Sequence, residues 1–212
     1  MQDAAPSALA AQRILRDPSQ FQWYVIPLFA LVVYVYACEV QRKAWGVVFA
    51  GMALFAMDLF NEIWNGLVFH FTRFAPVWGA PGKTAYLLLI GLNLEIAFMF
   101  SIAGISFTKM LPEDRAVRVL GLPNRWVHAG AMSAFCVGVE ILLNRAGALT
   151  WEYPWWSARF PLLIFLVGYL PFFVVAFWVH DLPTPERQGR AAGTLLGVVA
   201  ALGASFGLLG WI

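Results

Sequence analysis

Long apolar stretches alternate with short polar connections along most of the chain. A helix needs about 20 predominantly apolar residues to cross the hydrocarbon core of a bilayer. Windows of this kind lie near residues 22–38, 44–70, 84–108, 126–147, 160–180 and 191–212. The pattern predicts an all-α fold: a polytopic, multi-pass integral membrane helical bundle with about six transmembrane helices.

Composition agrees with a bilayer environment. Of the 212 residues, 61% are hydrophobic and 12% charged, which is more apolar and less charged than a soluble domain. The formal net charge is +2 and there is no basic run, so no nucleic-acid partner is expected. The partners that the composition indicates are membrane lipids.

Residues 1–20 precede the first apolar window and carry Arg13 and Arg16. They lack the short apolar region and small-residue cleavage site of a removable signal peptide. The segment from Ser7 to Leu15 is compatible with a helix on the membrane surface, ending at Asp17-Pro18. We therefore expect an N-terminal interfacial tail over 1–20 and a single transmembrane helical domain over 21–212.

The second window contains a row of polar side chains within an otherwise apolar helix. Asp58, Asn61, Glu62 and Asn65 are spaced by three or four residues, so they share one helix face. Ionisable groups at bilayer depth cost at least a few kcal/mol each and usually face a bundle interior or a wet cavity. The row predicts an inward-facing functional site.

Glu95 in the third window and Glu140 in the fourth bring the number of acids to four, with few cations nearby because Lys and Arg fall at the window ends. Burial and mutual repulsion then favour protonated carboxyls. A protonated acid beside an ionised one can act as general acid and base. We expect Glu62, Glu95 and Glu140 to converge on one cavity lined by the second to fifth windows, with Glu62 as proton donor and Asp58 setting its protonation.

Aromatic and amide side chains complete the expected substrate surface, since π faces stabilise a cation where water is excluded. Pro171 should kink the fifth window near its middle. The aromatic patch from Thr150 to Trp156 is typical of anchoring at a membrane interface. The residues expected to contact substrate are Asn61, Trp64, Asn65, Phe69, Phe98, Asn144, Tyr169 and Phe173.

Other interpretations of the acids stay open. Carboxyls and amides can hydrogen-bond helices together, and buried acids also form proton or cation sites in small transporters and lipid-binding proteins. A metal site is the weaker alternative, because the nearest histidine, His70, lies eight residues from Glu62 and no Glu-x-x-His or His-x-x-x-His pair exists. We expect neither a metal nor an organic cofactor.

The last window carries glycines in place of acids. Gly193/Gly197 and Gly203/Gly207 have the four-residue spacing of small residues that permits close helix contact. This predicts a packing helix, in the bundle or in a homo-oligomer.

The order of features over residues 50–182 resembles the emopamil-binding protein family of sterol isomerases and related EXPERA-domain proteins. The resemblance is carried by Glu62-Ile-Trp-Asn with Val68-Phe-His-Phe71, by Asn93-Leu-Glu95, by Gly138-Val-Glu140, by Tyr153-Pro-Trp-Trp and by Pro171. In that family a His and a Glu one turn apart act with a second Glu on the next helix to move a double bond through a carbocation.

Two positions depart from the family. Asp58 stands where the family has the His, and the fifth window has Tyr169 and Phe173 in place of an Asn-x-x-Trp motif. Small integral-membrane terpene cyclases are similar in the same way, and they start cyclisation by protonation from acidic residues. The resemblance implies an intramembrane isomerase or cyclase whose substrate is an isoprenoid or sterol-like lipid.

Overall fold

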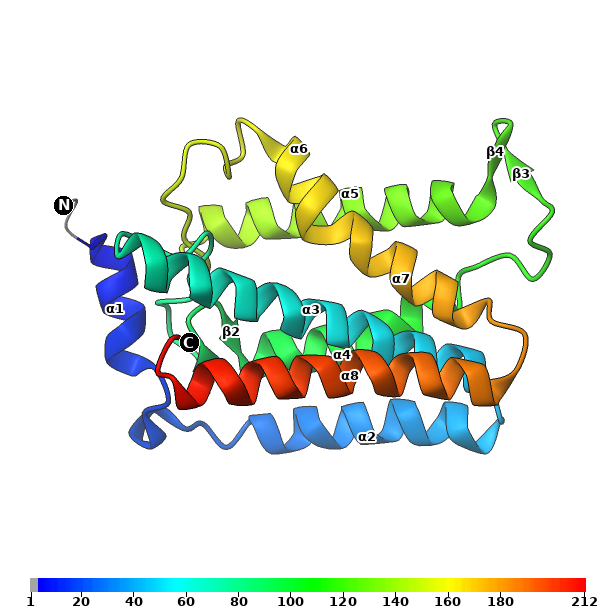
Figure 1. The fold of residues 1–212 in the computed structure, drawn as a ribbon, viewed down its shortest axis with the longest axis horizontal. Helices are drawn as coiled ribbons and strands as arrows, with labels where there is room; N and C mark the ends of the chain where they lie inside the picture. The colour runs from blue at the N-terminus through cyan, green and yellow to red at the C-terminus, as the bar shows by residue number, and fades with distance from the viewer. Residues whose placement is uncertain (1–3) are drawn as a thin grey trace.

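The structure is a computed structural model that describes residues 4–212, and the chain is mostly helical (Figure 1). In chain order the elements are α1 (Pro6–Ile14), η1 (Pro18–Gln20), α2 (Val25–Gln41), α3 (Trp45–Thr72), β1 (Leu87–Leu89), β2 (Leu92–Asn93), α4 (Leu94–Thr108), β3 (Arg118–Val119), β4 (Leu122–Pro123), α5 (Asn124–Arg145), α6 (Pro161–Leu163), η2 (Ile164–Tyr169), α7 (Leu170–His180) and α8 (Pro185–Leu208).

Within residues 4–212, four helical segments are long and apolar enough to cross a membrane: α3, α5, the continuous stretch of α6, η2 and α7, and α8. Helices α2 and α4 have 17 and 15 residues, which at 1.5 Å per residue reach about 26 and 22 Å. The hydrocarbon core is about 30 Å thick. By length alone, the bundle therefore has four candidate spans and two shorter apolar helices.

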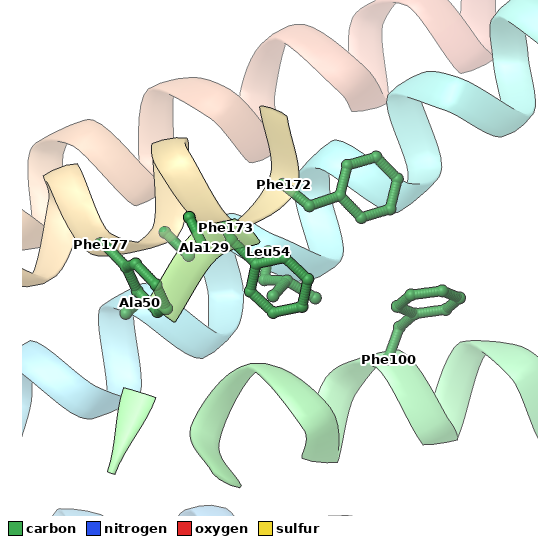
Figure 2. Close-up of a cluster of buried hydrophobic side chains, with 8 residues drawn as sticks. Ala50, Leu54, Phe100, Ala129, Phe172, Phe173 and Phe177 are labelled. Atoms are coloured by element: carbon green, nitrogen blue, oxygen red, sulfur yellow. The ribbon is translucent and has the colours of Figure 1, made fainter. Parts of the chain in front are cut away.

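Helix α3 is central and packs against α4, α7 and α8, while α5 packs against α7 (Figure 1). Small residues permit this packing. A Cβ atom added at Gly104 of α4 would lie 2.8 Å from the Cα atom of Gly51 in α3. Next to this contact, Ala50 and Leu54 of α3 form a buried cluster with Phe100, Ala129 and three phenylalanines of α7 (Figure 2).

The third apolar window is not one continuous helix, contrary to the sequence prediction. Its first part forms the antiparallel β1–β2 hairpin, in which Leu87 pairs with Asn93 and Leu89 with Leu92. The Asn93 side chain then accepts a hydrogen bond from the backbone N–H of Ile96 at 2.8 Å. Because this bond caps the helix N-terminus, α4 begins at Leu94.

The kink expected at Pro171 takes the form of the π-helical segment η2 just before α7. Proline lacks an N–H, so the carbonyl of Val167, four residues earlier, loses its helical donor. The Asn61 side-chain amide of α3 lies 3.4 Å from this carbonyl oxygen and 3.3 Å from that of Gly168. The amide thus replaces the missing donor and ties the kink to α3.

Helix α1, which lies in the predicted N-terminal tail, packs on the rest of the chain. Ala8 and Ala11 are buried, and the backbone N–H of Ala5 donates to the carbonyl of Phe74 at 2.9 Å. The Ser7 hydroxyl also bonds to Glu152. Residues 1–3 lie outside the described part of the chain.

Charged residues cluster at the end of the bundle that joins α7 to α8. Arg125 donates two hydrogen bonds to Asp181, at 2.9 and 3.1 Å, and Nδ1 of His180 lies 2.8 Å from the same carboxyl. Burial raises the pKa of Asp181, but the bonds from Arg125 and His180, with the charges of Arg125 and Arg115, outweigh it and hold that pKa below its usual value.

The α3–α4 contact predicts that substituting two glycines in helix interiors by alanine has different effects on the stability of the protein. Gly104→Ala should destabilise the protein by about 1–3 kcal/mol through overpacking, because the new methyl group meets backbone of α3. Gly197→Ala in α8 is the matched control, since a Cβ atom there has nothing within 4 Å. A Cβ atom at Gly193 or Gly207 likewise has nothing within 4 Å, so at these three positions the expected helix packing is not with other helices of the chain. Thermal unfolding in detergent measures both variants, and equal stability would contradict the packing argument.

The Asp181 cluster predicts a pH-dependent stability contribution. A carboxyl whose pKa is depressed on folding stabilises the protein above its unfolded pKa of about 3.9, and the contribution is lost as pH falls through the folded pKa. Asp181→Asn should therefore lower the unfolding temperature at neutral pH, with the gap to the unmodified protein closing in acid. Glu113→Gln, an exposed change nearby, is the control. A gap independent of pH would exclude this electrostatic origin.

Candidate functional site

A cavity of about 270 Å³ lies inside the bundle and is lined by residues of α3, α4, α5, η2 and α7 and of two connecting loops. This confirms the prediction that the second to fifth windows enclose a cavity. Three of the four predicted acids line it, namely Asp58, Glu62 and Glu140. They are only 3–5% exposed, so the polar row of α3 does face inward.

Glu62 is held by an indole from a loop. Nε1 of Trp78 donates to Oε1 of Glu62 at 2.7 Å. The loop itself is fixed by Asn65, whose Oδ1 accepts from the backbone N–H groups of Val77 and Trp78 at 2.7 and 3.2 Å, and whose Nδ2 donates to the Trp78 carbonyl at 2.7 Å. Because Asn65 lies one turn after Glu62, one helix face positions both the acid and its donor.

Glu140 of α5 has a similar arrangement, since Nε1 of Trp151 donates to its Oε1 at 3.0 Å. The carboxyl-bearing residues Asp58, Glu62 and Glu140 line the same cavity, and like charges in one site oppose each other's ionisation. Among the described residues, no Lys or Arg forms a salt bridge with these three acids.

Two buried carboxylate oxygens have no hydrogen-bond partner within residues 4–212, namely Oδ2 of Asp58 and Oε2 of Glu62. An unsatisfied buried polar atom costs about 1–3 kcal/mol, and such atoms in native structures often mark a site of function. Both residues line the cavity, although these two oxygen atoms themselves have almost no accessible surface.

Apolar side chains form most of the remaining wall, and several of them are aromatic. Trp78 stacks on Trp156 with ring centroids 5.5 Å apart, and the Trp64 ring lies next to both, at 5.9 and 6.5 Å. Glycines make room for the two lining indoles: a Cβ atom at Gly91 would lie 2.6 Å from the Trp78 ring, and one at Gly168 would lie 3.3 Å from the Trp156 ring.

Glu95 does not share the cavity, which corrects the prediction of a common site for four acids. It lies in the first turn of α4, where its carboxyl accepts hydrogen bonds from Tyr24, from the Thr84 hydroxyl at 2.8 Å and from the backbone N–H of Ala85 at 2.8 Å. The prediction treated residues 84–108 as one helix. Because the β1–β2 hairpin occupies its first part, Glu95 lies at the start of α4 and not in the middle of a helix.

Of the eight predicted substrate-contacting residues, Asn61 and Tyr169 line the cavity. The other six lie outside it and have packing or hydrogen-bonding roles. Asn65 fixes the Trp78 loop, Asn144 donates to the carbonyl of Leu149 at 3.1 Å, and four aromatic residues pack in clusters or ring pairs: Trp64, Phe69, Phe98 and Phe173.

Sequence reasoning missed most of the apolar wall. Trp78 and Trp156 line the cavity, and Trp156 is only 2% exposed, so the interpretation of the 150–156 patch as interfacial anchoring is wrong for this residue. One signal was present: a buried carboxyl without a cation needs an N–H or O–H donor. The tryptophans near the helix ends were the available donors. The other missed wall residues include Met99, Phe100, Phe107, Phe135, Cys136 and Phe172.

Comparison with known proteins places the chain in a family. A family described as an uncharacterized membrane protein family matches residues 5–208. The chain belongs to this membrane protein family. It is 57% identical over 210 residues to an uncharacterized protein of Archaeoglobus fulgidus, covering 99% of this chain and 98% of the relative. A second protein of that organism is 51% identical over 53 residues, which is 24% of this chain and 95% of the relative. No solved structure matches the chain.

The indole–carboxyl bond predicts a specific loss of stability. Trp78→Phe keeps an aromatic ring but leaves both oxygens of Glu62 without a donor, which should cost about 1–3 kcal/mol. Trp23→Phe, at a residue that is 78% exposed, is the control and should change little. Thermal unfolding of the two variants in the same detergent gives the comparison. If Trp78→Phe is as stable as the control, the bond to Glu62 contributes nothing.

Proposed function

We propose that this family member is a multi-pass enzyme with about six membrane helices that isomerises or cyclises an isoprenoid or sterol-like lipid by carboxylic acid–base chemistry. One observation supports this most: Glu62, held on one oxygen by Trp78 and unpartnered on the other, lines a cavity that is otherwise largely apolar and includes aromatic rings. Such a cavity combines a proton donor with π faces that favour a cation. It requires no metal and no organic cofactor.

In the proposed reaction, Glu62 transfers its carboxyl proton to one carbon of a double bond. The π electron pair forms the new C–H bond, the neighbouring carbon becomes a carbocation, and Glu62 is left as a carboxylate. Loss of a proton from an adjacent carbon to Glu140 re-forms a double bond one position along. Attack by a second double bond before this loss gives a ring. Return of the proton from Glu140 to Glu62 resets the site without an oxidant or reductant.

The alternative is a small transporter or a lipid-binding protein, in which the same acids hold a proton, a cation or a head group. The cavity's apolar lining with a few polar groups is also typical of ligand-binding sites. The two functions differ in what happens to the lipid. Purified protein in vesicles, incubated with polyprenyl lipids and followed by chromatography coupled to mass spectrometry, should produce isomeric or cyclic products of unchanged mass and altered retention time. Tight binding with no conversion would favour the lipid-binding alternative.

Substitutions of the acids distinguish proton donation from structural hydrogen bonding. Glu62→Gln keeps the size of Glu62 and can still accept the hydrogen bond from Trp78 but has no acidic proton, so turnover should fall about 10²–10⁴-fold with little change in thermal stability. Asp58→Asn should cost less, because it changes the surroundings of the donor and leaves the donor in place.

Glu95→Gln is the matched control for these variants, since Glu95 lies outside the cavity, and its turnover should stay near that of the unmodified protein. For each variant, the rate of product formation from the converted lipid is measured under single-turnover conditions. Full activity of both Glu62→Gln and Asp58→Asn would show that the acidic row of α3 is structural.

A further inference from the structure

Two residues of the cavity wall are also exposed on the outer surface of the bundle. Met99 of α4 is 44% exposed and Phe135 of α5 is 59% exposed, although both line the cavity. The acids of the same cavity are 3–5% exposed. The cavity therefore reaches the surface between α4 and α5, while its acidic part lies deep.

The position of Phe135 along α5 gives the depth of this opening. Helix α5 has 22 residues from Asn124 to Arg145 and is one of the candidate spans. Phe135 lies near its midpoint, about 16 Å from either end at 1.5 Å per residue. Half the thickness of the hydrocarbon core is about 15 Å. With α5 across the bilayer, the opening faces the ends of the acyl chains and not water.

The side chains around the opening suit an apolar occupant. Ala103 and Phe107 of α4 and Val139 of α5 line the cavity with Met99 and Phe135, and all five are apolar. Moving a charged or strongly polar head group to the bilayer centre is costly, whereas an apolar chain already resides there. The opening therefore admits the uncharged, apolar chain of a lipid and not its head group.

We propose that the gap formed by Met99, Ala103, Phe135 and Val139 is a lateral portal through which the apolar chain of a bilayer lipid enters the cavity and reaches Glu62 and Glu140. The substrate class follows from the portal: a lipid whose reacting double bond lies in its apolar chain, away from the head group. The reaction at the acids rests on the proposed function, but the entry of a chain does not.

The test uses the full-length protein in phosphatidylcholine vesicles with a trace of phosphatidylcholine that carries a diazirine at one acyl-chain end. After irradiation, peptide mass spectrometry should find adducts on cavity residues such as Glu62 and Glu140, as well as on lipid-facing residues such as Leu142. Val139→Trp should abolish the cavity adducts by filling the portal. Leu142→Trp is the matched control on the same helix, 63% exposed and not part of the cavity wall, and should leave them unchanged.

Phe135→Ala is the opposite change and should increase cavity labelling by widening the portal. Adducts on the outer surface of α5 without any in the cavity would overturn the proposal. So would cavity labelling in Val139→Trp equal to that of Leu142→Trp, or cavity labelling unaffected by Phe135→Ala. Labelling is scored without turnover, so cavity adducts in a protein that converts no lipid would refute the proposed enzyme and leave the portal standing.

Discussion

The polar side chains of α3 can be buried in an apolar bundle only where other parts of the chain supply hydrogen-bond partners, because lipid supplies none. Each amide of the row meets this requirement in a different way. Asn61 donates to carbonyls that the proline kink of the 161–180 segment leaves free, and Asn65 binds the backbone of the loop that carries Trp78. The two amides therefore connect α3 to two of the irregular segments that border the cavity, the π-helical segment and the loop that carries Trp78.

The acids of the row are satisfied less completely, and this separates their roles. Glu62 receives one indole N–H, and no side chain or backbone group of the described residues donates to Oδ2 of Asp58. Pure helix–helix hydrogen bonding would be expected to satisfy such atoms, since each unsatisfied one costs stability. One of these atoms is Oε2 of Glu62, the proposed proton donor. The others among the described residues are Oδ2 of Asp58, which belongs to the surroundings of that donor, Nε1 of Trp156 and Oε1 of Gln188. The incomplete hydrogen bonding of the proposed donor is why we place function at the acids and structure at the amides.

The sequence predicted the inward face of α3 because helical spacing and the cost of burying carboxyls together leave one arrangement. It did not predict the position of Glu95, since hydropathy cannot show that Asn93 caps a helix and ends a hairpin inside an apolar window. The tryptophan donors were missed for a related reason. Trp78 lies in a loop, and the conformation of a loop does not appear as a periodic pattern in the sequence. The glycines of α8 have the right spacing for contact, but spacing does not tell which helix, if any, lies opposite.

Exclusion of water explains why the acidic part of the cavity lies deep while the opening lies at mid-membrane. A carbocation is captured by any water molecule that reaches it, so the proposed chemistry needs a wall of aromatic rings and an entrance that faces hydrocarbon. An entrance on the aqueous side would admit water together with the substrate. Met99 and Phe135 are exposed, and together with Phe100 and Phe172 they belong to the apolar part of the cavity wall. The same wall would serve a lipid-binding protein equally well, and the unpartnered oxygen of Glu62 is the feature that favours chemistry over storage.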